Sequence, residues 1–235
     1  MGLKESGLRG SLRNVSVGID AIPDVGLDHF YYAPSLTSVD PWTDEKGSID
    51  LSANGSPQLV PDSINNEQAV EYDSDDNHQG SSTGSFGADG EWTAAGIIER
   101  SSSDSGFSVL FEVGSGSNGY AILADENNSG YTVVHRGADQ VTGGSLDTDP
   151  HVYVATHDGS AIYLDIDGAT AIDGATIDSP SDPTDHITIG ERANGGEEFV
   201  GSVGAGGHEA AFADSTRRDE LTDLLAEPFG ISTST

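Results

Sequence analysis

The sequence contains no cysteine, only two lysines and no long hydrophobic run. Without cysteine the chain can form neither a disulfide framework nor a thiolate metal site. No segment approaches the roughly 20 apolar residues of a transmembrane helix. Residues 1–18 lack the continuous apolar stretch of a signal peptide. We therefore expect a chain that is not inserted into a membrane and is not exported through an N-terminal signal.

Positive charge is also scarce, because 40 Asp and Glu residues face only 9 Lys and Arg residues, for a formal net charge of −31. Phosphate binding requires clustered basic side chains, so nucleic acids and anionic membranes are disfavoured partners. High charge can indicate disorder, but apolar runs such as residues 107–113 and 131–136 can bury surface. At molar salt the Debye length falls to about 3 Å, which screens acidic self-repulsion. The composition therefore predicts a folded protein from a high-salt host.

Short apolar segments separated by turn residues dominate the chain from residue 92 onward. Val, Ile, Tyr and Phe are enriched in them, as in β-strands. Asp158-Gly159 and Asp167-Gly168 follow strand-like runs, and Asp-Gly is typical of hairpin turns that need positive φ. This spacing predicts a sandwich or barrel. The predicted strands comprise residues 92–100, 107–113, 120–124, 131–136, 152–156, 161–165, 187–190 and 199–203.

The predicted organisation is an N-terminal arm (residues 1–26), one domain (27–231) and a tail (232–235). The early part of the domain, residues 27–90, is loop-rich, and residues 73–90 form one long polar loop in this interpretation. One helix is predicted near the end of the domain. Its start would be capped by a hydroxyl of the Ser215-Thr216 pair, and Pro228 would end it.

Three segments, in order along the chain, carry a resemblance to a known superfamily. Residues 42–73 contain Trp-x-Asp-x-x-Gly, a later Pro, Ile-Asn and the alternating stretch Ala-Val-Glu-Tyr. Residues 151–169 form a hairpin pattern in which both strands run into Asp-Gly. Residues 187–231 combine an Ile-Gly strand, a Gly-rich turn, Phe-x-Gly and an amphipathic helix that ends near Phe-Gly-Ile. Together these segments resemble the concanavalin A-like lectin and laminin-G-like superfamily.

The resemblance implies an all-β, concanavalin A-like jelly-roll sandwich of two antiparallel sheets, with one short C-terminal helix and an extended N-terminal arm. It says little about ligands, because this fold hosts lectins, glycan hydrolases, adhesion modules and viral surface proteins. One departure is that Pro150 precedes His151 where many relatives carry Trp. Another is that Gly204, Gly206 and Gly207 replace bulkier strand residues, so we expect a bulged edge or an edge covered by a partner.

Catalytic patterns are missing. Glycan hydrolysis needs two carboxylates across the scissile bond, and glycoside hydrolases of this fold often carry Glu-x-Asp-x-x-Glu on one strand. The nearest match, Asp165-Ile166-Asp167, lacks the glutamates and is interpreted as turn carboxylates. No Gly-x-Ser-x-Gly nucleophile motif is present. The sequence therefore predicts a protein that is not an enzyme.

Oxygen-rich loops make calcium the metal to consider. The candidate ligands are Asp73, Asp75, Asp125 and Asn127, which come from two separate loops. Calcium takes about six to eight oxygen ligands, which flexible loops can supply. Every loop of so acidic a chain carries carboxylates, so solvated loops without an ion are the favoured alternative. We expect no required cofactor and leave calcium open.

Carbohydrate binding often uses an exposed aromatic ring beside polar groups. The candidates here are Trp42, Trp92, Tyr31 and Tyr32. Trp92 opens an apolar strand, which favours a core position. Trp42 lies in a polar loop and is the better candidate, but the resemblance gives it a packing position. No glycan-binding residue is therefore assigned from the sequence.

Residues 1–26 are locally cationic, with Lys4, Arg9 and Arg13. Termini often fray, but segments of opposite charge to the rest of a chain are often interaction segments, and both interpretations stay open. As a docking arm, this segment would attach the domain to an acidic partner. Its opening also resembles that of small haloarchaeal virus-associated proteins with this domain.

These observations favour a non-enzymatic surface protein of a haloarchaeal virus particle, such as a capsid decoration, a turret or a tail fibre. Assembly in a high-salt archaeal cytoplasm would place it on the virion surface without a signal peptide. The expected partners are other virion proteins, further copies in a homo-oligomer with a trimer favoured, and a host-surface glycan. The alternative is a cellular carbohydrate-binding or adhesion module of a halophilic archaeon.

Overall fold

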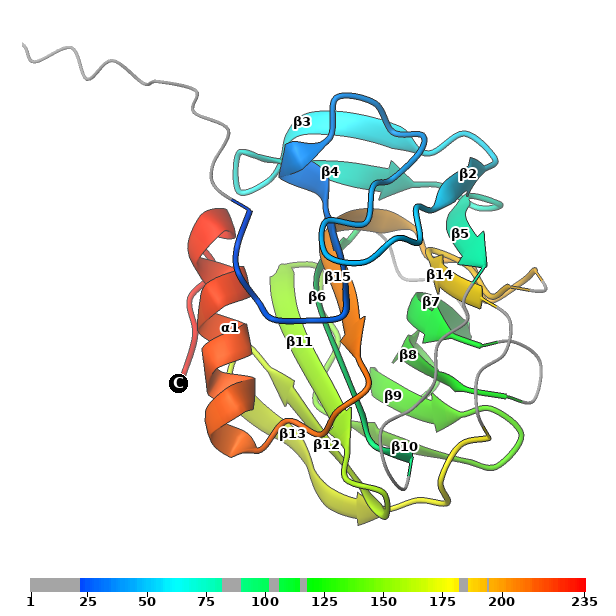
Figure 1. Cartoon of the computed structure of the whole chain (residues 1–235), viewed down its shortest axis with the longest axis vertical. Coiled ribbons are helices and arrows are strands. Elements are labelled where there is room, and N and C mark those ends of the chain that lie inside the picture. The colour runs from blue at the N-terminus through cyan, green and yellow to red at the C-terminus, as the bar shows by residue number, and fades with distance from the viewer. Residues whose placement is uncertain (1–21, 82–89, 102–105, 115–117, 182–185, 194) are drawn as a thin grey trace, which may run out of the picture.

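The computed structural model describes residues 22–81, 90–101, 106–114, 118–181, 186–193 and 195–235. Within them, two antiparallel β-sheets form a sandwich, and helix α1 (Ser215–Phe229) covers the outer face of one sheet (Figure 1). This arrangement confirms the predicted all-β sandwich with one C-terminal helix. The cationic residues of the predicted arm, Lys4, Arg9 and Arg13, lie outside the described residues.

In the described part of the chain, the sheet beneath α1 has eight strands in the order β13-β12-β11-β6-β15-β4-β3, with β1 paired to β15. The other sheet has seven strands in the order β10-β9-β8-β7-β14-β5-β2. The strands are β1 (His29–Tyr32), β2 (Ser52–Asn54), β3 (Gln58–Ile64), β4 (Glu67–Tyr72), β5 (Asn77–Ser81), β6 (Trp92–Arg100), β7 (Phe107–Val113), β8 (Tyr120–Asp125), β9 (Gly130–His135), β10 (Asp139–Gly143), β11 (Pro150–His157), β12 (Ala161–Ile166), β13 (Ala169–Thr176), β14 (His186–Ile189) and β15 (Gly201–Glu209). One 3-10 turn, η1 (Ala33–Ser35), follows β1.

The strand predictions from residue 92 onward are largely confirmed. Strands β6 and β7 occupy the predicted residues without a shift, and the two Asp-Gly turns join β11 to β12 and β12 to β13. The prediction for residues 199–203 was wrong at both ends, because β15 begins at Gly201 and continues to Glu209. Its four glycines gave no strand signal, since β-propensity depends on side chains that pack on a pleated surface.

The loop-rich prediction for residues 27–90 was wrong, because strands β1 to β5 lie there. Strand β5 falls inside the predicted polar loop 73–90. Its backbone pairs with β14 on one side and with β2 on the other. Hydrogen bonding to two neighbours, rather than an apolar side-chain pattern, therefore defines β5.

Aromatic rings fill the space between the two sheets. Trp92 and Tyr120 stack with ring centroids 3.7 Å apart, and Trp42 packs edge-on against Tyr31 and His78. Both tryptophans are fully buried. Burying one large apolar side chain contributes about 1.5–3 kcal/mol, so each of these rings stabilises the sandwich.

The glycine-rich part of β15 lies in the middle of its sheet, so the expectation of an edge at Gly204, Gly206 and Gly207 was wrong. Strand β6 pairs along one side of β15, and β4 and then β1 pair along the other. A Cβ on Gly204 would lie 2.6 Å from the ring of Phe229 in α1. The missing side chain of Gly204 therefore lets the helix approach the sheet. The predicted bulge does occur, between Val203 and Ala205.

Replacing Gly204 with valine is expected to destabilise the domain. The new side chain would overlap the Phe229 ring, and overpacking of a core costs about 1–3 kcal/mol. Urea unfolding in molar NaCl measures the change, with Ala211→Val on the exposed connection after β15 as the control. Adding Phe229→Leu should recover part of the loss. A Gly204→Val variant as stable as the control would contradict the close approach of α1.

Helix α1 begins and ends differently from the prediction. Its N-cap is Asp214, whose carboxylate accepts a hydrogen bond from the Arg217 amide at 2.9 Å, and not a Ser215-Thr216 hydroxyl. Pro228 lies inside the last turn, and the helix ends at Gly230 in the left-handed conformation (φ 60°). The helix packs Leu221, Leu225 and neighbouring apolar side chains against the eight-stranded sheet. No helix among the described residues is long and apolar enough to span a bilayer.

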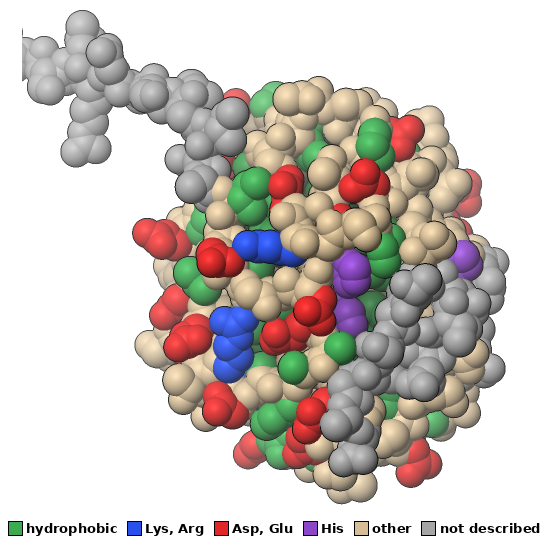
Figure 2. Space-filling view, in the orientation of Figure 1, with side chains coloured by type: hydrophobic (Ala, Val, Ile, Leu, Met, Phe, Trp, Pro, Cys, Tyr) green, Lys and Arg blue, Asp and Glu red, His purple; other side chains and the backbone are tan. Residues whose placement is uncertain are grey.

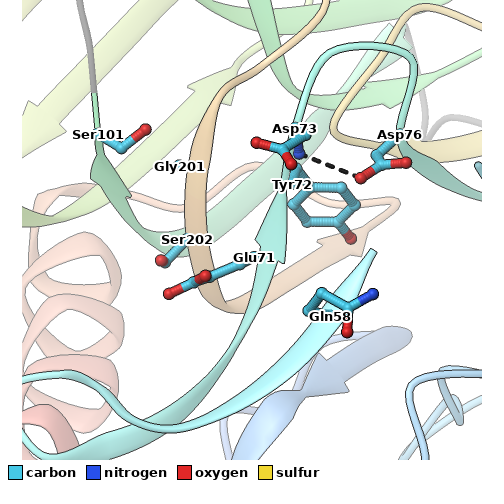
Figure 3. A pocket seen from close by; sticks show the side chains of 8 residues that line it. All are labelled: Gln58, Glu71, Tyr72, Asp73, Asp76, Ser101, Gly201 and Ser202. Carbon is cyan, nitrogen blue, oxygen red and sulfur yellow. Dashed lines mark hydrogen bonds between the residues drawn. The ribbon is translucent and has the colours of Figure 1, made fainter. Parts of the chain in front are cut away.

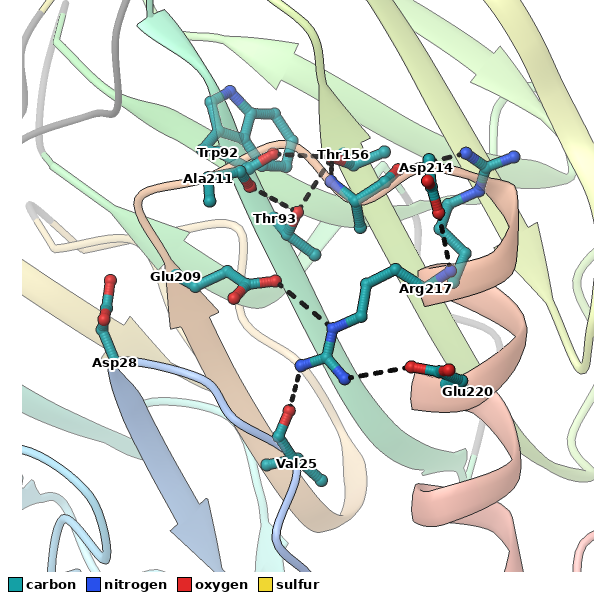
Figure 4. Close-up of polar contacts among 12 residues, drawn as sticks. Val25, Asp28, Trp92, Thr93, Thr156, Glu209, Ala211, Asp214, Arg217 and Glu220 are labelled. Carbon is teal, nitrogen blue, oxygen red and sulfur yellow. Dashed lines mark hydrogen bonds and ion pairs between the residues drawn. The ribbon is translucent and has the colours of Figure 1, made fainter.

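Arg217 ties the start of the described chain to the helix and the sheet (Figure 4). Its guanidinium donates to the Val25 carbonyl and faces the carboxylates of Glu209 and Glu220 at 4.0 and 3.7 Å. Val25 is fully buried beneath α1. Next to this contact, the Thr93 and Thr156 hydroxyls form a 2.9 Å hydrogen bond beneath the connection from β15 to α1.

Candidate functional site

The Trp-x-Asp-x-x-Gly motif that supported the resemblance organises the loop between β1 and β2. Asp44 accepts hydrogen bonds from the His29 ring and from the amides of Phe30, Lys46, Gly47 and Ile49. Burial alone would raise its pKa, but these donors lower the pKa to about 2. Both carboxylate oxygens of Asp44 accept hydrogen bonds from β1 and the loop, so we interpret the motif as structural.

The first pair of predicted calcium ligands, Asp125 and Asn127, lies at the turn between β8 and β9 in the seven-stranded sheet. Asp125 is fully buried at the end of β8. One carboxylate oxygen accepts from the Asn127 amide at 3.1 Å, and the other accepts from the Asn128 side chain at 2.6 Å. Asn127 itself is exposed. The carboxylate therefore closes the turn between β8 and β9.

The second pair, Asp73 and Asp75, lies after β4. Both side chains are exposed, and Asp75 occupies the left-handed region at φ 72°. The neighbouring Asp76 accepts hydrogen bonds from the amides of Ser56 at 2.6 Å and Asp73 at 3.1 Å. Among the described residues no group of three or more His, Asp or Glu side chains is placed to hold a metal ion. The structure thus leaves the four predicted ligands in separate turns.

The four aromatic candidates for a sugar-binding platform lie in the core. Trp42, Trp92, Tyr31 and Tyr32 are at most 1% exposed. None of them can stack on a ligand at the surface. The core position predicted for Trp92 and the packing position that the resemblance implies for Trp42 are confirmed, and Trp42 is not a surface platform despite its loop.

A cavity of about 160 Å³ opens where strands of the eight-stranded sheet end, and we call it the strand-end cavity (Figure 3). Its walls come from the start of β3, the end of β4, the residue after β6 and the start of β15. The lining residues are Gln58, Glu71, Tyr72, Asp73, Asp76, Ser101, Gly201 and Ser202. Residues far apart in sequence thus meet at one end of the sheet.

Local hydrogen bonds hold the cavity wall in place. Ser202 shares a 2.9 Å hydrogen bond with Ser63, which also donates to Glu71 at 3.2 Å. Position 201 requires glycine, because a Cβ there would lie 2.3 Å from the Glu99 carbonyl oxygen of the neighbouring strand β6. The lining offers an amide, carboxylates and hydroxyls within a small space, which suits a ligand rich in hydroxyl groups. No motif marks these residues, so this cavity could not be predicted from the sequence.

A second cavity of about 250 Å³ lies where β10 and β13 approach each other, and we call it the edge cavity. His151, at the start of β11, lies between two carboxylates of this cavity. Its Nδ1 is 2.6 Å from Asp167 and its Nε2 is 2.7 Å from Asp147. The hydrogen bond to Asp167, together with the contact to Asp147, outweighs burial and raises the pKa of His151 to about 9. The ring is therefore a cation at neutral pH.

Stability should fall between pH 6.5 and pH 9 because of His151. Its folded-state pKa of about 9 exceeds the ordinary value of 6.5, so the contribution is complete below pH 6.5 and is lost as the pH rises through 9. Asp147 is half exposed, so solvent screens its attraction to His151. We therefore expect the free energy of unfolding to fall by roughly 1–2 kcal/mol, less than the full pKa difference implies. Urea unfolding at pH 6 and pH 9.5 measures it. The His151→Gln variant should lack this decrease, and an equal decrease in both proteins would contradict the assignment.

A buried ion-pair network lies on the face of the seven-stranded sheet that points away from the inter-sheet core. Glu112 points away from the inter-sheet core, since its neighbours Phe111 and Val113 belong to that core. Its carboxylate has no exposed surface, and burial raises its pKa despite the facing Arg136. Arg136 donates to Glu112 at 2.8 Å and to Glu197 at 2.8 Å. The network is closed to solvent around Glu112, so we interpret it as structural.

Comparisons with known proteins agree on the fold. No protein-family model matches the sequence, and no curated protein matches it. Among solved structures, the chain is similar to domain 4 of AbnA, a GH43 extracellular arabinanase from Geobacillus stearothermophilus, in complex with arabinotriose. That match has a TM-score of 0.65 and 10% identity, and it covers 85% of this chain and 98% of the domain.

Larger proteins contain a similar sandwich. Trypanosoma rangeli sialidase in complex with sialic acid matches with a TM-score of 0.61 and 16% identity, over 88% of this chain and 34% of the sialidase. The W1252A mutant of HCR D/C matches with a TM-score of 0.61 and 10% identity, over 84% of this chain and 51% of that chain. The chain thus spans about a third of the sialidase. At these identities the likeness shows the fold alone, a two-sheet antiparallel β-sandwich.

Proposed function

We propose that this chain is a non-catalytic carbohydrate-binding domain that holds a hydroxyl-rich glycan in the strand-end cavity. The observation that carries the proposal is the lining of this cavity. Gln58 can donate and accept, Glu71 and Asp73 accept, and the hydroxyls of Ser101 and Ser202 do both. Sugars present the same mixture of donors and acceptors.

One similar structure supports this proposal, since it is a domain in complex with arabinotriose and the match covers 98% of that domain. The environments of the carboxylates in the strand-end cavity fit a role in binding without catalysis. Hydrolysis needs one carboxyl group kept protonated, commonly by burial, whereas Glu71 and Asp73 are exposed. Asp76 is buried but accepts backbone amides. The carboxylates are therefore suited to accept hydrogen bonds from a sugar.

A glycan array probed with the labelled chain in molar NaCl tests the proposal, followed by calorimetry with the strongest neutral glycan. Gln58→Trp, which fills the strand-end cavity from the exposed edge strand β3, should weaken binding at least about tenfold. Gln140→Trp, on the exposed edge strand β10, is the matched control. Absence of binding to every glycan, or equal affinities of the two variants, would overturn the proposal. Release of reducing sugar by the wild-type chain would overturn the non-catalytic part.

The position of this domain on a virus particle remains a prediction. It rests on the acidic composition, the resemblance and the cationic residues Lys4, Arg9 and Arg13. A glycan-binding domain on a virion would contact the host surface, whereas the alternative, a cellular adhesion module, would bind the same class of ligand. Cryo-electron microscopy of particles from a high-salt lysate distinguishes the two. Loss of particle incorporation after deletion of residues 1–20 is expected for the virion role.

A further inference from the structure

We infer that the ligand is a neutral oligosaccharide that extends from the strand-end cavity along the rim of the eight-stranded sheet to the edge cavity. This inference rests on the proposed function, because it assigns the class of glycan to the same site. The strand-end cavity alone is small, at about 160 Å³. The edge cavity, of about 250 Å³, would accommodate a further part of the same chain.

The register of the strands places both cavities on one rim. Gly201, at the start of β15, pairs with Tyr72 at the end of β4 and with Arg100 at the end of β6. At the same end of the sheet, Pro150 begins β11 opposite Glu99. Strand β12 also finishes there, with Ile166 opposite Tyr153 of β11. The two cavities are therefore neighbours along the strand ends and do not lie at opposite ends of the sandwich.

The distance between the cavities follows from the strand order β12-β11-β6-β15-β4. The edge cavity lies near β11 and β12, and the strand-end cavity lies near β15 and β4. Three strand spacings of about 4.8 Å separate them, or roughly 14 Å. A single sugar ring is too short to reach both, so only an oligosaccharide can use them together.

The rim between the cavities is polar and acidic. Glu99 lies between them on β6. Burial is the main cause of its raised pKa, and the nearby carboxylates of Asp149 and Glu71 raise the pKa further. Asp147 and Asp167 border the edge cavity, where the His151 cation neutralises part of their charge. Carboxylates accept hydrogen bonds from hydroxyl groups and repel other anions. The rim therefore favours neutral sugars over uronic or sialic acids.

A length series tests this inference. The probes are arabino-oligosaccharides from the monosaccharide to the hexasaccharide, or the matching series of the strongest neutral array ligand, with oligogalacturonides as acidic comparators. Affinity should rise by at least about tenfold when the chain becomes long enough to reach both cavities. Ala169→Trp, which fills the edge cavity from the position opposite Ile166, should remove this gain and leave the affinity for short chains unchanged. Thr176→Trp, further along the same exposed edge strand, is the matched control.

The outcomes separate the inference from the proposed function. If Gln58→Trp weakens binding but Ala169→Trp does not weaken the binding of long chains, the strand-end cavity acts alone, and the inference fails while the proposed function stands. Affinity that is flat with chain length, or tighter binding of the oligogalacturonides, also overturns the inference. If no glycan binds the wild-type chain, the proposed function fails and the inference fails with it.

Discussion

Dialysis from molar to millimolar NaCl is expected to lower the thermal unfolding midpoint by about 10–20 °C, the shift that a loss of roughly 5 kcal/mol produces in a domain of this size. The formal net charge of −31 concentrates like charges on a compact sandwich. Carboxylates are scattered over the face shown in Figure 2, where Lys and Arg are few. In dilute buffer this repulsion is unscreened, whereas at molar salt it acts only over about 3 Å.

Circular dichroism melts across a NaCl series measure this shift. Sucrose at matching osmolality is the control, because it stabilises compact states without screening charge. A gradual rise of the midpoint with salt, absent in sucrose alone at low salt, is the expected pattern. A midpoint that does not depend on salt would contradict the interpretation of the charge as an adaptation to high salt.

Arg136→Ala is expected to destabilise the domain by about 3–5 kcal/mol, because it leaves the fully buried Glu112 carboxylate without its cation. The alanine variant also removes a 2.8 Å contact to Glu197, which lies at φ 57°. The free energy of unfolding from urea titrations in molar NaCl measures the effect. The loss should shrink as the pH falls, since burial raises the pKa of Glu112 and the group can then be buried as a neutral acid.

Companion variants separate the charge effect from simple loss of packing. In the double variant Arg136→Met with Glu112→Gln both ionic groups are replaced by side chains of similar length, so it should recover most of the lost stability. Arg192→Ala, at a partly exposed arginine 3.4 Å from Glu197, should cost less than about 1 kcal/mol. Equal effects of Arg136→Ala and Arg192→Ala would show that burial of Glu112 does not set the cost.

The sequence allowed the second half of the sandwich to be predicted because its strands carry their own signal. Val, Ile and Phe alternate or cluster in β6 and β7, and Asp-Gly marks the turns around β12. The resemblance also implied a sandwich of two antiparallel sheets and a packing role for Trp42. Strand β5, with its sequence Asn-His-Gln-Gly-Ser, carries no such signal. Its existence depends on partners that are distant in sequence.

The candidate site could not be predicted for a related reason. Gln58, Glu71, Ser101 and Ser202 come from four segments and are unremarkable polar residues in each. Only the register of β15 with β4 and β6 brings them together. The residues that did stand out in the sequence, such as Asp125 and Trp42, turned out to hold turns and core in place. In this chain the conspicuous residues support the fold, and the cavity lining is composed of inconspicuous ones.

The Arg217 contact also determines how the domain can be tethered. Arg217 holds Val25 against the first turn of α1. At the other end of the chain, Ser234 donates to the Asp167 carbonyl and Thr235 bonds to Asp223 of the helix. Both ends of the described chain therefore run along the helix side of the sandwich (Figure 1). A surface attached through either end would face α1, and the seven-stranded sheet would point outward.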